Sequence, residues 1–131
     1  MHTLPLRLLP GDDLRRALEA AVASRGATAA FVVAGIGSLK PTRLRLAGAE
    51  ATLDLDVDVE VLSASGTVAA NGSHLHLSVS DAEGRVLGGH AGYGCTVRTT
   101  AELLLVLLPD WHFTRELDAA TGWAELQIRP R

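Results

Sequence analysis

The chain has 131 residues, of which 47% are apolar and 21% charged, and its formal net charge is −3. The length fits one domain with one hydrophobic core, and the apolar fraction excludes a disordered chain. The excess of acids gives no sign of the basic bulk charge that is typical of nucleic-acid-binding proteins.

Two further features bear on the compartment. The single cysteine, Cys95, excludes an intramolecular disulfide and a multi-cysteine zinc site, which fits a reducing environment. The longest aliphatic run covers residues 103–108, whereas a membrane-spanning helix needs about twenty residues. Pro5 and Arg7 interrupt the first apolar stretch, and a secretion signal would not contain them there. We therefore expect a soluble, cytoplasmic protein with no membrane association.

A short strand over residues 3–9 and then a helix are expected at the N-terminus. After the Pro-Gly pair that ends the strand, Asp12 or Asp13 can cap the helix by accepting hydrogen bonds from its first amides. The apolar side chains of the helix recur at spacings of three and four residues and form one stripe, at Leu14, Leu18, Ala21 and Val22. Gly26 is expected to end this helix, which is the one long helix that the sequence predicts.

From residue 27 onward the apolar period changes to two, which predicts strands. Residues 30–36 form a continuous apolar run, which is typical of a strand buried on both faces. Residues 42–46 alternate between arginine and leucine, and residues 52–62 alternate over eleven positions between acids and leucine or valine. Each alternating stretch predicts a strand with one face in the core and one in solvent.

The acidic side of the stretch 52–62 has two interpretations. Its members are Asp54, Asp56, Asp58 and Glu60. They could hold a metal, but a row of like charge is also how an exposed strand avoids association with another sheet, and we favour this second interpretation. If residues 42–46 pair with this stretch as a hairpin, Arg43 and Arg45 can lie opposite Asp54 and Asp56 as a cross-strand ladder.

The second half of the chain continues with strands. Residues 73–80 and a strand that begins at Arg85 are expected to form a hairpin, and residues 96–108 form a further strand, although 101–108 alone would also fit a helix. An irregular segment follows that contains Trp111, His112 and Phe113, and residues 124–128 form a closing strand. Residues 1–131 therefore predict a single α+β domain in which a mostly antiparallel β-sheet packs against one main helix.

Three of the five histidines, His74, His76 and His90, lie close together in the sequence. On a strand, His74 and His76 point to the same face, about 6.5–7 Å apart, while Leu75 and Leu77 point to the core. Two neutral imidazoles at this spacing can converge on one zinc ion or on another divalent transition metal.

Whether His90 joins the other two depends on the register of the hairpin. With residues 82–84 as a three-residue loop, His76 lies directly opposite His90 and all three imidazoles share one face. With a four-residue loop, His90 would lie beside Leu75 and point to the other face, because a slip of one residue reverses every side chain.

Four glycines around His90, namely Gly88, Gly89, Gly92 and Gly94, favour a functional site. Positions without side chains open a concave space for a pocket and let another backbone approach closely, and a bulge at the first two could redirect His90. The alternative is that the histidines lie on a polar sheet face and only bind their neighbours or line a subunit contact.

Three histidine ligands would leave one coordination position open for water or a substrate oxygen, as in catalytic zinc sites. Glu102 is the candidate for an additional ligand or acid, although an exposed glutamate on a strand needs no role. Cys95 is expected to be a small buried apolar residue. No serine or cysteine is placed beside a histidine in a way that predicts a hydrolytic triad.

The His-Leu-His strand and the Gly-Gly-His return strand resemble the PPC (plants and prokaryotes conserved) domain, also called DUF296. The resemblance includes residues 72–81, Gly84, Val86 and residues 88–90, and it extends to residues 10–13, 35–39, 62–68, 94–97, 100–102 and 113–118. It thus covers nearly the whole chain. The departures are Ala91, where a larger apolar residue is expected, and the lack of the AT-hook that precedes the domain in plants.

The resemblance implies an α+β domain that assembles as a homotrimer and that carries a family label as a predicted DNA-binding protein. The fold is also similar to that of acetolactate decarboxylase, in which three histidines hold zinc. The resemblance therefore makes His74, His76 and His90 the metal ligands of this bacterial-type chain.

Three functions follow as hypotheses. The first is a homotrimeric binding or regulatory module with a three-histidine metal pocket that also takes a small anion through Arg98 or Arg115. The second is a DNA-associated regulator without an AT-hook, which the charge of the chain disfavours because affinity for nucleic acid depends on clustered cations. The third is a metal-dependent lyase, so whether the chain is an enzyme stays open.

Overall fold

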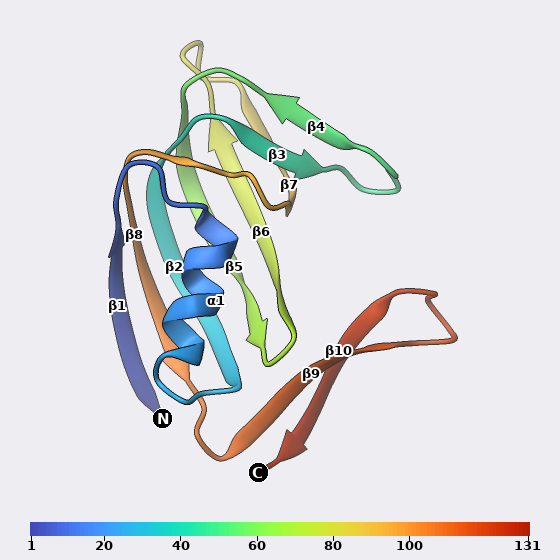
Figure 1. Ribbon diagram of the computed structural model, residues 1–131. Coiled ribbons are helices and arrows are strands. Elements are labelled where there is room, and N and C mark those ends of the chain that lie inside the picture. The colour runs from blue at the N-terminus through green and yellow to red at the C-terminus, as the bar shows by residue number, and fades with distance from the viewer.

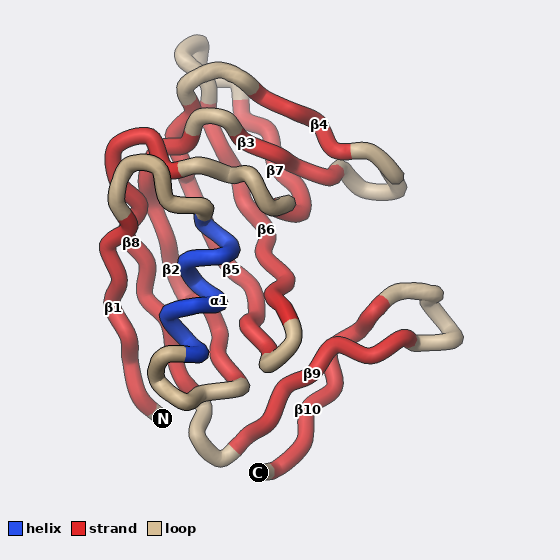
Figure 2. Tube along the Cα trace, in the orientation of Figure 1, coloured by secondary structure: helices blue, strands red, loops and turns tan.

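Eight of the ten strands form one antiparallel sheet, in the order β1-β8-β2-β5-β6-β7-β3-β4, and the last two form a separate hairpin. The computed structural model describes residues 1–131 and has one helix (Figures 1 and 2). The elements are β1 (His2–Leu8), α1 (Leu14–Ala23), β2 (Ala29–Leu39), β3 (Thr42–Arg45), β4 (Thr52–Leu55), β5 (Val59–Ala69), β6 (Gly72–Ser80), β7 (Val86–Ala91), β8 (Val97–Leu107), β9 (Trp111–Leu117) and β10 (Ala124–Pro130). The predicted α+β class is confirmed.

The helix α1 lies against one face of the sheet (Figure 1). Asp13 is its N-cap and accepts a hydrogen bond from the backbone N–H of Arg16. The buried stripe consists of Leu14, Leu18 and Val22, which join the core formed by the sheet. Gly26 follows the C-cap with a left-handed φ of 65°, a conformation that glycine adopts without strain. No helix of the chain has the length and apolarity that a membrane crossing would require.

The prediction that the strand at residues 30–36 is buried on both faces is wrong. In β2, Ala30 and Val32 are buried, but Val33 is 55% exposed and Ile36 is 57% exposed. The reason is that α1 covers only one face of the sheet, so the apolar run is in the core on one side and uncovered in this single chain on the other (Figure 1).

The stretch 52–62 is not one strand. It divides into β4 at the edge of the sheet and the start of β5 in its centre. The hairpin of β3 with β4 forms as expected at Arg43, which pairs with Asp54 at 3.4 Å, but Arg45 lies opposite Thr52 and not opposite Asp56. An alternation of side chains cannot reveal where a strand stops and its chain crosses to another position in the sheet, because both strands have the same period.

The apolar stretch that also fitted a helix is extended. It forms β8, which pairs with β1 on one side and with β2 on the other. Leu103, Leu105 and Leu107 of this strand point into the core under α1. As a strand, this segment forms backbone hydrogen bonds with β1 and with β2. A helix at this position would leave the backbone groups of both neighbours without these partners.

The segment with Trp111, His112 and Phe113 is not irregular, because it begins β9, which pairs with the closing strand β10. Phe113 is buried, and its ring meets Phe31 of β2 edge to face with centroids 5.8 Å apart. This contact attaches the β9–β10 hairpin to the sheet face opposite α1. The hairpin thereby reaches the side of the sheet on which the histidines lie.

Candidate metal centre

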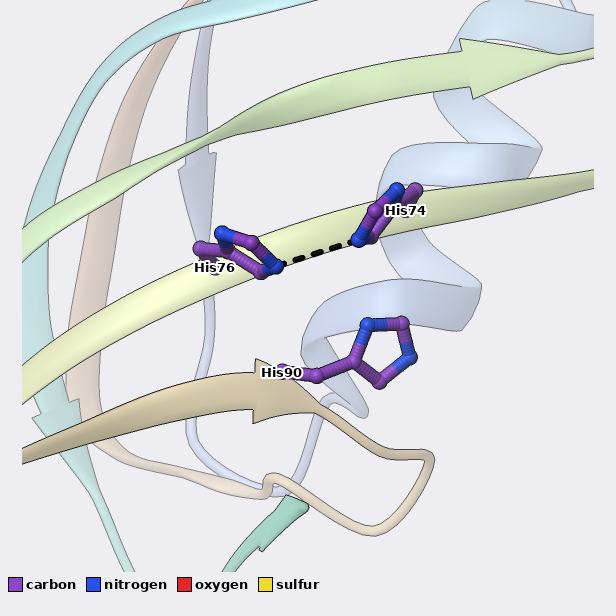
Figure 3. Close-up of side chains that lie close together, drawn as sticks. All are labelled: His74, His76 and His90. Carbon is purple, nitrogen blue, oxygen red and sulfur yellow. Dashed lines mark hydrogen bonds between the residues drawn. The ribbon is translucent and has the colours of Figure 1, made fainter. Parts of the chain in front are cut away.

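His74, His76 and His90 lie together on the face of the sheet that α1 does not cover (Figure 3). His74 and His76 alternate along β6 with Leu75 and Leu77, which are buried in the core. Alternation therefore fixes both histidines to one face and anchors their strand through the other.

The register of the β6–β7 hairpin is the one that a three-residue loop predicts. The N–H of Asp81 donates to the carbonyl of Arg85, and Gly84 has a left-handed φ of 78°. His76 then lies directly opposite His90. The loop therefore decides that the third ring shares the face of the other two.

The ring nitrogens are close enough to share one ion. The Nε2 atoms of His74 and His76 are 3.1 Å apart, and the candidate ligand atoms of all three rings lie within 4.8 Å of one another. Two nitrogens that are each about 2.05 Å from a tetrahedral zinc ion lie about 3.3 Å apart. The His74–His76 pair therefore needs almost no movement to become a pair of ligands, and His90 needs a small shift of its ring.

The protonation of the rings suits metal binding. Burial is the main cause that lowers the pKa of His90 to about 4, and burial followed by the charge of Arg115 lowers the pKa of His74. Both rings are consequently neutral at neutral pH, which is the form that binds a metal. The Nδ1 atom of His90 is buried without a hydrogen-bond partner. A ring nitrogen that is buried and unpaired is costly unless a ligand occupies it, so the three residues fit a nitrogen-binding metal.

A cleft of about 760 Å³ opens beside the histidines. Loops of two hairpins, β3–β4 and β9–β10, form its sides, and both hairpins extend to the same side of β6 in Figure 1. His74 and His90 line it together with three arginines, Arg15, Arg45 and Arg115, and two glutamates, Glu50 and Glu125. Arg15 is paired with Glu19 at 3.8 Å, whereas Arg45 and Arg115 form no ion pair and are the groups that an anion could contact.

Arg115 is held in place beside His74. The side chain of Asn71 bonds both backbone groups of Arg115, with distances of 2.9 Å to its carbonyl and 2.7 Å from its N–H. The guanidinium donates to Thr67 Oγ1 through Nη2, and its Nη1 lies 3.4 Å from His74 Nδ1. Of the two arginines expected to contact an anion, Arg98 and Arg115, only Arg115 therefore lines the cleft beside the histidines.

Two other expected residues lie elsewhere. Arg98 forms an ion pair with Asp58 at 3.1 Å and does not line the cleft. Glu102 is exposed on β8, opposite Arg7 of β1, and lines a different cavity of about 640 Å³. Three strands separate β8 from the return strand of the histidine hairpin, so Glu102 does not reach the rings of its own chain.

The glycines near His90 serve close packing and not an open space. A Cβ on Gly88 would lie 2.9 Å from the carbonyl of Leu77, and one on Gly89 would lie 2.8 Å from the carbonyl of Arg45. At Gly92 a Cβ would meet Arg43 at an ordinary 3.5 Å. The expected close approach of a neighbouring backbone is thus present, but none of these glycines lines the cleft.

Cys95 is fully buried, as expected, and burial raises the pKa of its thiol. Sequence reasoning missed three residues at the cleft: Arg15, Arg45 and Asn71. Arg15 stems from the helix and bonds the carbonyls of Ser73 and Ala91, so no local pattern connects it to the histidines. The alternation of residues 42–46 predicted that Arg45 lies opposite Asp56, so it gave no signal for a place at the cleft.

The chain is similar to a known domain family and to part of a longer bacterial protein. Residues 1–109 match the model of the Plants and Prokaryotes Conserved (PCC) domain family. The chain is 44% identical over 126 residues to the bifunctional protein GlmU of Synechococcus sp. (strain JA-2-3B'a(2-13)) and spans 20% of the length of that protein.

Among solved structures, a hypothetical protein from Salmonella superimposes with a TM-score of 0.94 at 45% identity, over 99% of this chain and 94% of the other. The metal-containing protein AF0104 from Archaeoglobus fulgidus superimposes with a TM-score of 0.83 at 26% identity, over 97% of this chain and 94% of the other. A candidate DNA-binding protein from Ralstonia eutropha, at 22% identity and a TM-score of 0.79 over 95% of this chain and 90% of the other, shares the fold.

Proposed function

The chain belongs to the Plants and Prokaryotes Conserved (PCC) domain family, and we propose that it is a binding or regulatory module built around a metal held by His74, His76 and His90. The observation that carries this proposal is the convergence of three imidazoles from two paired strands, with two Nε2 atoms 3.1 Å apart. The likeness to a metal-containing protein from Archaeoglobus supports it.

Zinc is the metal that we propose first, because three neutral nitrogen donors are a common zinc set. When bound, such an ion would supply a Lewis-acidic position for an oxygen ligand. The chain's own residues do the rest. β6 and β7 aim the rings, and the arginines of the cleft attract an anion toward them.

A binding role is favoured over a lyase role. The acid expected to serve a reaction, Glu102, lies on β8 and lines a separate cavity. The sequence resemblance implies a fold similar to that of acetolactate decarboxylase, but the one acid proposed for such a reaction is absent from the cleft beside the histidines. Similarity of fold alone does not transfer chemistry.

We also propose that the module is a homotrimer, as the family resemblance implies. Support comes from apolar side chains that stay exposed in a single chain on β2, β5 and β8, where α1 gives no cover: Phe31, Val33, Ile36, Leu62 and Leu104. Exposed apolar groups that cluster in this way are typical of protein interfaces.

Direct DNA binding has less support. A basic patch would need clustered arginines without acidic partners, but Arg43 forms an ion pair with Asp54 and Arg98 forms one with Asp58. With a net charge of −3 the chain has no excess of cations to release counterions from a phosphate backbone.

The test is a metal analysis of protein purified without a histidine tag. We expect one zinc ion per chain in the native protein and none in His76→Ala. His2→Ala is the matched control, because His2 is exposed on β1 outside the cluster, and it should keep its zinc. Native protein without metal, or His76→Ala with full metal content, would contradict the proposal.

A further inference from the structure

The two ring nitrogens of His74 face different partners. Nε2 lies 3.1 Å from Nε2 of His76, and Nδ1 lies 3.4 Å from Nη1 of Arg115. A guanidinium only donates hydrogen bonds. In the metal-free chain, Nδ1 of His74 therefore accepts from Arg115, and the proton of the ring sits on Nε2 and points to His76.

A metal held by His74 and His76 would reverse this arrangement. The His74 nitrogen that faces His76 is Nε2, so this atom would bind the metal without its proton, and the neutral ring would carry its proton on Nδ1. Nδ1–H and the N–H of Arg115 would now face each other as two donors. Metal-bound histidines normally donate this second N–H to a carboxylate, a carbonyl or water.

No carboxylate or carbonyl of the chain is hydrogen-bonded to Nδ1 of His74, whose one partner is Arg115. Arg115 forms no ion pair, its Nη2 donates to Thr67 Oγ1, and its Nε is buried without a partner. Because Asn71 bonds both backbone groups of Arg115, the strand that carries this guanidinium is fixed next to the ring.

One carboxylate of the cleft, Glu125, is close enough to His74 and Arg115 for its charge to act on the pKa of both, but it forms no hydrogen bond to either. Its Oε1 accepts a hydrogen bond from Thr121 Oγ1 at 3.0 Å. Arg45, which also lines the cleft, has its guanidinium carbon 4.8 Å from the ring centre of Trp123 and forms no ion pair. The cleft thus contains two guanidinium groups, those of Arg45 and Arg115, that form no ion pair with a carboxylate of the chain.

We propose that a small carboxylate binds in this cleft, with one oxygen that accepts from Nδ1–H of His74 and from Arg115. The planar guanidinium matches a carboxylate in shape and charge, and a cleft of about 760 Å³ leaves room for the rest of such a molecule. This inference rests on the proposed function. It adds that the metal and the carboxylate strengthen each other's binding, because the carboxylate stabilises the tautomer that the metal requires and the coupling is reciprocal.

The test measures zinc affinity by competition with a fluorescent chelator, in sodium acetate and in sodium chloride at equal ionic strength. For the native chain we expect acetate to tighten zinc binding about fivefold or more, in the range of ordinary coupling between sites. In Arg115→Gln we expect zinc affinity that no longer depends on acetate, since the amide oxygen can itself accept from His74. This variant also corrects for zinc that acetate binds in solution.

Arg98→Gln is the matched control, because Arg98 lies outside the cleft and its variant should respond to acetate as the native chain does. Equal zinc affinity of the native chain in acetate and chloride would overturn the inference, as would an acetate effect that survives in Arg115→Gln. Sulfate as effective as acetate would overturn the carboxylate class. Zinc binding weakened by Glu125→Gln, with no effect of acetate, would identify Glu125 as the acceptor instead. Absence of zinc binding in every variant would overturn the proposed function itself.

Discussion

The two faces of the sheet use one strand for different purposes. On the side of α1, β6 contributes Leu75, Leu77 and Val79, all buried in a continuous core. On the other side the same strand presents His74 and His76, and His74 lines the cleft. The comparison teaches that a strand with period two can stabilise the fold through one face and leave the other free for binding.

The largest difference between the faces should appear in stability. Leu75→Ala removes a side chain that is 1% exposed and should cost about 2–5 kcal/mol of the free energy of unfolding. His76→Ala on the same strand, one position away and exposed, should change it by less than about 1 kcal/mol in the absence of metal. Urea unfolding in EDTA measures both. Equal losses would mean that the histidine face also carries the fold.

Metal should reverse part of this contrast. Because zinc binds only the folded arrangement of three rings, free zinc at about 100 times its dissociation constant should stabilise the native chain by about 2.7 kcal/mol. His90→Ala should lose this gain while its stability in EDTA stays near that of the native chain. Thermal unfolding with zinc and with EDTA gives the comparison, and an equal gain in both proteins would rule out His90 as a ligand.

A new charge on the uncovered apolar face of the sheet should weaken the trimer, whereas a new charge on the surface near α1 should not. Ile36→Glu replaces an apolar side chain that is 57% exposed in the single chain with a carboxylate. If this face is the interface of the trimer, the unpaired charge would be buried there at a cost. We expect the dissociation constant of the trimer to rise at least about tenfold, which is about 1.4 kcal/mol. Sedimentation velocity measures it.

Arg25→Glu, at an exposed position just after α1, is the control for added charge and should leave the assembly intact. A native chain that sediments as a monomer would remove the trimer from the account. An Ile36→Glu variant that assembles normally would move the interface to another face.

The smallest effect concerns the β9–β10 hairpin that carries Arg115. The guanidinium of Arg129 lowers the pKa of Glu116 to about 2, from an ordinary value near 4.5. A carboxylate whose folded pKa is depressed stabilises the fold above its unfolded pKa, and this contribution declines as the pH falls from about 4.5 to about 2. Both groups are solvent-exposed, so the effect is small and local.

Both tryptophans of the chain, Trp111 and Trp123, belong to this hairpin or to its turn, so their fluorescence reports on it. The native chain should show a transition below about pH 4.5 that is weaker in Glu116→Gln. Identical acid titrations of the two proteins would show that the ion pair does not hold the hairpin.

The shared face of His74 and His76 could be predicted, because alternation along one strand is local information. The sequence left a three-residue and a four-residue loop open for His90, and the three-residue loop of the structure places His90 opposite His76. The uncovered side of β2 could not be predicted, since an apolar run has the same appearance whether a second layer or another subunit covers it. For the same reason Phe31 gave no hint of its contact with Phe113.

The cleft could be predicted only in part. Arg115 was expected near the site, but its fixed position depends on Asn71, which is 44 residues away in the sequence and bonds it in the folded chain. Glu102 and Arg98 failed to reach the cleft because the order of strands in the sheet separates them from β6. Strand order is a long-range property that no local pattern contains.

The most direct test of the metal centre is anomalous diffraction at the zinc absorption edge, on crystals of protein purified without a tag. The account requires one anomalous peak per chain, about 2.0–2.1 Å from a ring nitrogen of each of His74, His76 and His90. Crystals grown with zinc that show no peak among these three rings, or a peak only at other residues, would contradict it.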